Sequence, residues 1–168
     1  MKVEPTTQRD KLAGAPDVFD PVNVTMDVDV YYTGDGYPVK VKSPIYCARS
    51  FADTVLQCIE DWCATYSFRP CHLGVYNPRM ARRVNGTLIV PHRWSNHAYG
   101  AAIDFAGVLT TDSPDDYMNI IDMLNDDNYR DIAQELIDNC EVAIEDAGRR
   151  IEIVNEGSGT WMHIGMRP

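Results

Sequence analysis

The amino-acid sequence predicts an α+β domain in which helices pack on a small antiparallel sheet. Apolar residues recur at helical spacing in long segments, and short apolar or alternating runs bounded by turn residues indicate strands. No internal repeat or low-complexity tract appears in the 168 residues. Chain length therefore favours one globular unit, with an N-terminal arm or hairpin over residues 1–43 and a main domain over residues 44–168.

The N-terminal segment shows strand-like alternation. Apolar and polar residues alternate from Val22 to Tyr31, as in a half-buried strand, and Gly34-Asp35-Gly36 then indicates a turn. We expect this segment to lie against the main domain as an extended arm or a hairpin.

The first helix is predicted from Ser43-Pro44 to about Tyr66, with serine as N-cap and proline at the first helical position. Its apolar stripe repeats every three or four residues and consists of Ala48, Phe51, Val55, Ile59 and Trp62. The Arg69-Pro70 pair follows the end of this helix.

Further elements follow from the same patterns. Helices are predicted over Pro114–Leu124 and Asp131–Ala147, and Gly148 suits the position after the last helical turn. Strands are predicted over 71–76, 101–106, 151–154 and 161–164. A Gly-Ser-Gly turn at 157–159 joins the last two strands.

Composition excludes several classes of protein. Fifteen basic and 25 acidic side chains give a formal charge of −10, so a general nucleic-acid binder or a basic membrane-surface protein is not expected. No apolar run approaches the roughly 20 residues of a membrane span, and the first residues lack the apolar region of a signal peptide. Five cysteines without a C-x-x-C pair favour reduced, buried thiols made in a cytosol.

The chemistry is concentrated in residues 93–105. Asp104 lies in a small, apolar, strand-like run, where a carboxylate is costly unless it is paired or binds a metal. His97 precedes it by seven residues, across Gly100, which permits a tight bend. A histidine and an aspartate brought together in this way are suitable ligands for zinc.

A third candidate ligand is His163, which is embedded in an apolar strand near the C-terminus. Three protein ligands and one open position are the layout of a catalytic zinc site. Glu156 lies seven residues earlier, across the glycine-rich turn, and is the candidate general base or acid.

Simpler interpretations exist for each residue taken alone. A single histidine in a strand is usually a hydrogen-bonded core residue, a single aspartate before a loop is usually a cap, and Glu156 beside Gly157 suits a solvated turn. The convergence of three polar residues at unusually apolar positions favours the metal interpretation.

The ten residues from Ser95 to Asp104 resemble the S-x-H-x-x-G-x-A-x-D signature of the hedgehog-fold zinc peptidases. These are the D-alanyl-D-alanine carboxypeptidases and the phage L-alanyl-D-glutamate endopeptidases. Trp161-Met162-His163 is similar to their C-terminal W-x-H element. The resemblance covers roughly residues 70–168. It implies a hedgehog-like fold with His97, Asp104 and His163 as zinc ligands.

The resemblance also implies a base and substrate-binding groups. Many members of the family place an acidic residue three positions before the last histidine, where this chain has Thr160. Other members place a glutamate at the end of the preceding strand. Glu156 matches that position, and Glu152 is the alternative. An upstream arginine holds a substrate carboxylate or carbonyl oxygen in the family. Arg79 fits best, although Arg82, Arg83 and Arg93 compete. Ser95 is expected to orient substrate or a ligand, or else to cap a turn.

Together these features predict a zinc-dependent peptidase that cleaves bacterial peptidoglycan stem peptides. The alternatives are a D,D-carboxypeptidase that trims a terminal D-alanine, and a non-catalytic zinc-binding module of the same fold. Without a signal peptide, we expect a phage endolysin or virion-associated lysin, made in the cytoplasm and reaching the wall through lysis or within a virion. No nucleic-acid or membrane partner is expected.

Overall fold

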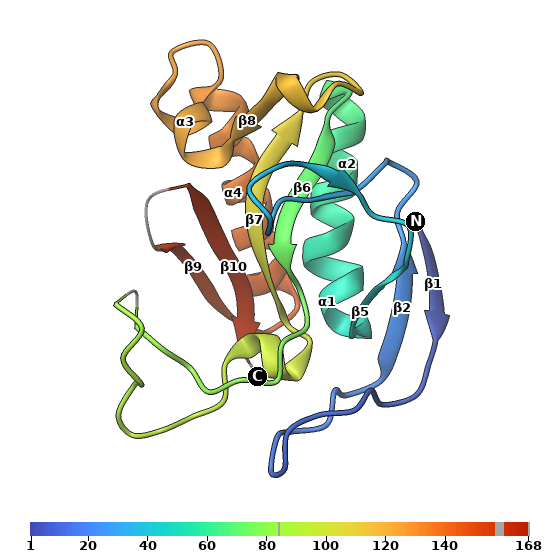
Figure 1. Ribbon diagram of the computed structural model, residues 1–168, viewed down its shortest axis with the longest axis vertical. Coiled ribbons are helices and arrows are strands. Elements are labelled where there is room, and N and C mark those ends of the chain that lie inside the picture. The colour runs from blue at the N-terminus through green and yellow to red at the C-terminus, as the bar shows by residue number, and fades with distance from the viewer. Residues whose placement is uncertain (84, 157–159, 168) are drawn as a thin grey trace.

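The computed structural model describes residues 1–83, 85–156 and 160–167, and of Glu156 the backbone alone. The chain mixes helices with two sheets, a small antiparallel one and a larger mixed one (Figure 1). The Gly-Ser-Gly turn predicted at 157–159 lies outside the described residues. No described helix is long and apolar enough to cross a membrane.

The small sheet has the strand order β1-β2-β5, with β1 at Lys2–Pro5, β2 at Pro21–Thr25 and β5 at Ile45–Ala48. The predicted start of the first helix at Ser43-Pro44 is therefore wrong. All four residues of β5 are buried, and their backbone pairs antiparallel with β2. This pairing satisfies the backbone hydrogen bonds of an apolar segment, so the helix begins only afterwards.

That helix runs continuously from residue 49 to residue 66. It comprises α1 (Arg49–Phe51), a π-helical segment (Ala52–Leu56) and α2 (Gln57–Tyr66), and it ends where Ser67 adopts a left-handed conformation. The predicted apolar stripe is buried, and the Trp62 indole N–H donates to the carbonyl of Ile132, 2.8 Å away, in α4 (Arg130–Asp146). Helix α4 matches its predicted bounds to within one residue, with Gly148 left-handed beyond it.

The larger sheet has the order β4-β3-β6-β7-β10-β9, and β8 pairs with β7. Its strands are β3 (Tyr31–Tyr32), β4 (Val39–Lys40), β6 (Arg69–Gly74), β7 (Ala102–Leu109), β8 (Tyr117–Asn119), β9 (Arg150–Glu156) and β10 (Trp161–Arg167). Strand β3 lies parallel to β6, so the sheet is mixed and larger than the small antiparallel sheet predicted.

The helix predicted over Pro114–Leu124 is also wrong. The segment divides into a 3-10 turn (Pro114–Asp116), strand β8 and α3 (Ile120–Asn125). The side chain of Asn119 accepts from the Asp122 N–H at 2.8 Å and thereby caps α3. Residues 117–119 pair with β7 as a strand, so the helix begins at Ile120, six residues later than predicted.

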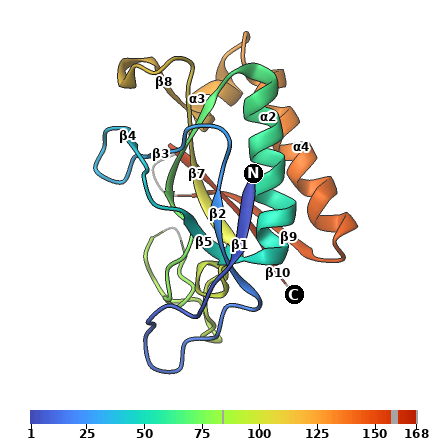
Figure 2. The same ribbon diagram turned by 90° about the vertical axis from the view of Figure 1, so that its right-hand side faces the viewer.

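Helices α2 and α4 lie on one side of the large sheet, and the β3–β4 hairpin lies on the other (Figure 2). The main core fills the helix side, and its largest buried side chains include Phe51, Phe105 and Leu136. Residues 1–43 contribute Val18, Val22 and Val24 to this core and strands to both sheets, so they are part of the globular unit. The site residues lie on the opposite face.

Candidate metal centre

His97 lies in a 3-10 turn, Asn96–Tyr99, immediately before β7. Its Nδ1 is 2.7 Å from the backbone carbonyl oxygen of Val75, which can only accept, so Nδ1 carries the proton. Nε2 is then the ring nitrogen available to a metal ion, and it lies 3.0 Å from Asp104 Oδ1. The Val75 carbonyl thus fixes both the tautomer and the direction of the ring.

Asp104 and His163 lie directly opposite one another in the β7–β10 ladder. The His163 Nδ1 is 3.2 Å from the same Asp104 Oδ1 that faces His97. One ligand atom from each of the three residues can be chosen so that all lie within 4.8 Å of one another. The three polar residues predicted from widely separated segments are therefore brought together, as two buried histidines and a largely buried carboxylate.

The electrostatic environment keeps Asp104 ionised. Burial raises the pKa of this carboxyl, but the hydrogen bonds with His163 and His97 outweigh burial and hold the pKa well below its usual range. An ionised carboxylate is the form that binds a metal.

A second carboxylate holds His163 from the other side of its ring. Glu152 Oε1, on β9, is 3.2 Å from His163 Nε2. The other oxygen of Glu152 forms an ion pair with Arg167 and lies 3.8 Å from an Arg93 nitrogen. Burial raises the pKa of Glu152, but His163 and then Arg167 lower it to about 2. Glu152 is therefore an ionised carboxylate that already has a histidine and an arginine as partners.

Gly165 leaves the space for this arrangement. It pairs with Glu152 in the β9–β10 ladder, and a Cβ at this position would stand 2.9 Å from His163 Nε2. A side chain at residue 165 would therefore displace the His163 ring. Glycine within a strand often marks such a close approach.

The donor set fits a metal ion. His97 Nε2, an Asp104 oxygen and His163 Nδ1 face one another, while the second nitrogen of each ring points to an oxygen of Val75 or Glu152. Two imidazoles and one carboxylate are ligands that zinc accepts, and acceptors on the outer ring nitrogens are usual at such sites. The cluster could hold a metal ion, and these contacts do not select one metal over another.

The predicted base, Glu156, is the last residue of β9, and its backbone pairs with Trp161. Its side chain lies outside the described part of the structure. Thr160, three residues before His163, is exposed.

Ser95 and Arg79 lie next to each other, because the Ser95 N–H donates to the Arg79 carbonyl at 3.0 Å. Ser95 precedes the 3-10 turn but its hydroxyl does not cap it. The hydroxyl is buried, and within the described residues it has no hydrogen-bond partner. The alternative role of Ser95 as a turn cap is thus not what the structure shows.

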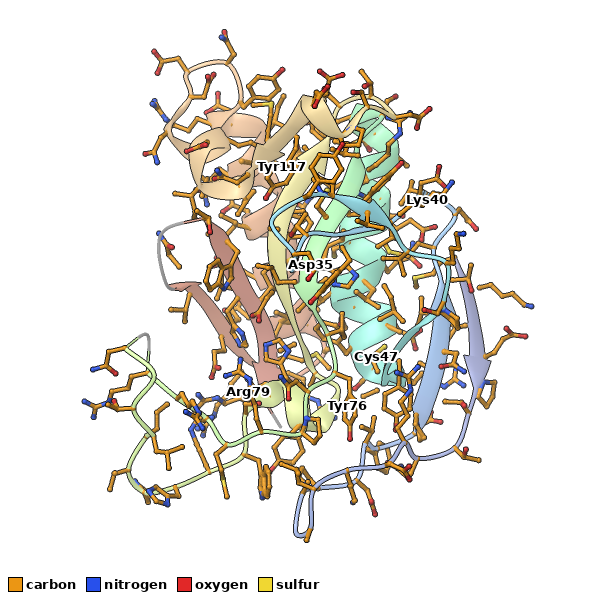
Figure 3. The ribbon with its side chains drawn as sticks, in the orientation of Figure 1. Asp35, Lys40, Cys47, Tyr76, Arg79 and Tyr117 are labelled. Atoms are coloured by element: carbon orange, nitrogen blue, oxygen red, sulfur yellow. The ribbon has the colours of Figure 1, made fainter. Side chains whose placement is uncertain are left out.

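The competing arginines differ in what they contact. Arg82 and Arg83 are exposed in the loop after β6, whereas Arg93 lies near Glu152. Arg79 is half-buried, and Figure 3 shows it at the end of the sheet where the 3-10 turn lies. This placement distinguishes Arg79 from the two exposed arginines.

Sequence reasoning did not foresee two contacts of the site, although it named Glu152 as the alternative base. The Val75 carbonyl is a backbone group and has no sequence signal. The contact of Glu152 with His163 did have a sequence signal, because Glu152 and Val154 lie on the same face of a strand next to the one that carries His163. The register between these two strands could not be known from the sequence.

Comparison of the chain with known protein families, with curated proteins and with solved structures found no match.

Proposed function

We propose that this protein is a zinc-dependent peptidase that cleaves peptides of bacterial peptidoglycan. The observation that carries the proposal is the meeting of His97, Asp104 and His163 in one largely buried cluster with acceptors behind both rings. A group of two histidines and one aspartate suits a hydrolytic metal centre. The choice of substrate rests on the resemblance of residues 95–104 and 161–163 to the hedgehog-fold zinc peptidases.

The proposed roles follow from the donor set. His97 Nε2, Asp104 and His163 Nδ1 hold the ion. When bound, zinc supplies a Lewis acid that lowers the pKa of a water and polarises a carbonyl. Glu156 takes a proton from the attacking water and returns it to the leaving amine. Arg79 binds a substrate carboxylate or carbonyl oxygen, and its backbone link to Ser95 keeps it near the His97 turn.

Digestion of purified peptidoglycan tests this function. The zinc-loaded protein should release soluble peptide fragments, and a chelator should stop their release until zinc is restored. The masses of the fragments distinguish an endopeptidase from a D,D-carboxypeptidase, because only the latter releases free D-alanine. Zinc bound at one ion per chain without any cleavage would instead favour the non-catalytic module.

The Glu156→Gln variant tests the base. We expect it to bind zinc as the wild type does and to cleave about 100-fold more slowly or worse. Glu145→Gln is the matched control, because it makes the same change at an exposed position of α4. Cleavage at the wild-type rate by zinc-loaded Glu156→Gln would exclude Glu156 as the base.

A further inference from the structure

A pocket of about 360 Å³ lies beside the metal centre on the same face of the large sheet. Its lining includes Ala106 in β7 and Trp161 in β10. Ala106 is two residues from Asp104 and Trp161 is two residues from His163, so each lies on the face of its strand that carries the ligand. The pocket therefore begins two residue positions along the two strands from the candidate metal ligands.

The β3–β4 hairpin forms the opposite wall of this pocket, with Thr33, Gly34 and Pro38 among its lining residues. Two hydrogen bonds fix the hairpin: the Thr33 N–H donates to the His72 carbonyl at 3.0 Å, and the Gly36 N–H donates to the Thr33 carbonyl at 2.9 Å. The wall is thus tied to β6, next to the strand that carries Asp104.

Leu73 of β6 and two residues of β8, Tyr117 and Asn119, complete the enclosure. The Tyr117 hydroxyl donates to the Ala106 carbonyl at 3.3 Å and so joins β8 to the floor. Figure 3 shows Tyr117 towards the upper end of the sheet and Asp35, in the turn of the hairpin, below it. The enclosure therefore has walls from three different segments of the chain.

The lining is uncharged and mostly apolar, with Thr33, Asn119 and Thr160 as its polar members. Leucine, proline, alanine, tyrosine and tryptophan contribute most of its side chains, and none of the described residues that line it is acidic or basic. Asp35, in the hairpin turn, is exposed, and its carboxylate would repel an acidic group nearby. A volume of this size accommodates one amino-acid side chain together with adjoining backbone.

We propose that this pocket is the specificity subsite of the enzyme and holds an uncharged, apolar residue of the peptide next to the bond that is cleaved. The proposal rests on the proposed peptidase function and deepens it. The occupant is a substrate residue because the pocket lies beside the candidate metal ligands, two positions along the same pair of strands and on the same face. Selectivity against charged residues then comes from the β3–β4 hairpin, Leu73 and β8, outside the motif that holds the metal.

A peptide panel tests the subsite. Blocked tripeptides that carry alanine, leucine, glutamate or lysine at the varied position are offered to the zinc-loaded protein, and binding is measured by calorimetry and cleavage by mass spectrometry. We expect the apolar peptides to bind about tenfold or more tightly than the charged ones. Leu73→Glu should weaken binding of the apolar peptides about tenfold, and Leu73→Gln should weaken it less.

Leu12→Glu is the matched control, because it introduces the same charge at an exposed leucine outside this pocket and should leave binding unchanged. Retained zinc content and circular dichroism establish that the Leu73 variants are folded. Equal binding of apolar and charged peptides, or unchanged binding by folded Leu73→Glu, overturns the subsite. Selective binding without cleavage of any peptide overturns the peptidase function but retains the subsite, so the two failures are distinguishable.

Discussion

His163 is held by carboxylates on both sides of its ring, with Asp104 at Nδ1 and Glu152 at Nε2, each 3.2 Å away. The Asp104 contact is on the side of the ring that faces the candidate metal position, and the Glu152 contact fixes the orientation of the ring. Arg167 in turn holds Glu152, so a chain of charged contacts runs from the metal position to the end of β10. We therefore interpret Glu152 as a positioning residue and not as the base.

Replacement of Glu152 tests this role at the level of one residue. Glu152→Ala removes the acceptor behind His163, so we expect zinc affinity to fall about 10- to 100-fold. Glu152→Gln keeps an oxygen acceptor and should lose less. Competition with a chromophoric chelator measures both. Zinc affinity equal to that of the wild type in the alanine variant would contradict the role.

At the scale of elements, the connection between the 3-10 turn and β7 sets the distance between His97 and Asp104. Gly100 makes this connection with φ +64°, and its carbonyl accepts a hydrogen bond from the Ala48 N–H at 2.9 Å. A Cβ there would stand 2.9 Å from the Ala48 nitrogen and 3.1 Å from Cys47 Cα. The bend expected from the sequence is thus present, and the crowding against β5 is an additional constraint.

Two glycine-to-alanine variants separate conformation from crowding. Gly148 also has a positive φ, +69°, but a Cβ there meets nothing within 4 Å. We expect Gly148→Ala to cost about 1 kcal/mol in the free energy of unfolding, from the left-handed backbone alone. Gly100→Ala should cost about 3 kcal/mol, because overpacking adds to strain. Urea unfolding measures both values, and equal losses would argue against crowding at residue 100.

The elements that the sequence predicted well are those with a strong local signal. Helix α4 has its apolar stripe and a glycine beyond its end, and both are present. The wrong predictions concern Ile45–Ala48 and Tyr117–Asn119, where a good helix start is followed by strand pairing with β2 and β7. A local sequence pattern does not show which strand edge will lie beside a segment. Pairing with such an edge made both segments strands instead of helices.

At the scale of the whole molecule, the candidate metal ligands come from a turn and two strands that are far apart in the sequence. An ion that binds these three residues only when they are assembled must stabilise the folded chain. The large sheet supplies the framework, since β7 and β10 are adjacent and β6 positions the Val75 carbonyl that follows it.

Thermal unfolding with and without zinc measures this coupling. At a free zinc concentration about 100 times the Kd, the folded state gains about 2.7 kcal/mol, which raises Tm by roughly 5–10 °C for a chain of this size. A chelator should reverse the increase. His163→Ala should abolish the zinc-dependent shift, whereas Leu12→Glu should retain it. A zinc-dependent shift in the His163→Ala variant would exclude that residue as a ligand.

The sequence by itself determined the class of elements, the net charge and the three polar residues at apolar positions, because these depend on residue type and short spacing. Only the tertiary structure decided that β3 joins the main sheet, that Glu152 lies behind His163 and that a hairpin from residues 1–43 encloses the pocket. Strand register and the contacts of backbone carbonyls arise from pairing between distant segments, which no local pattern encodes.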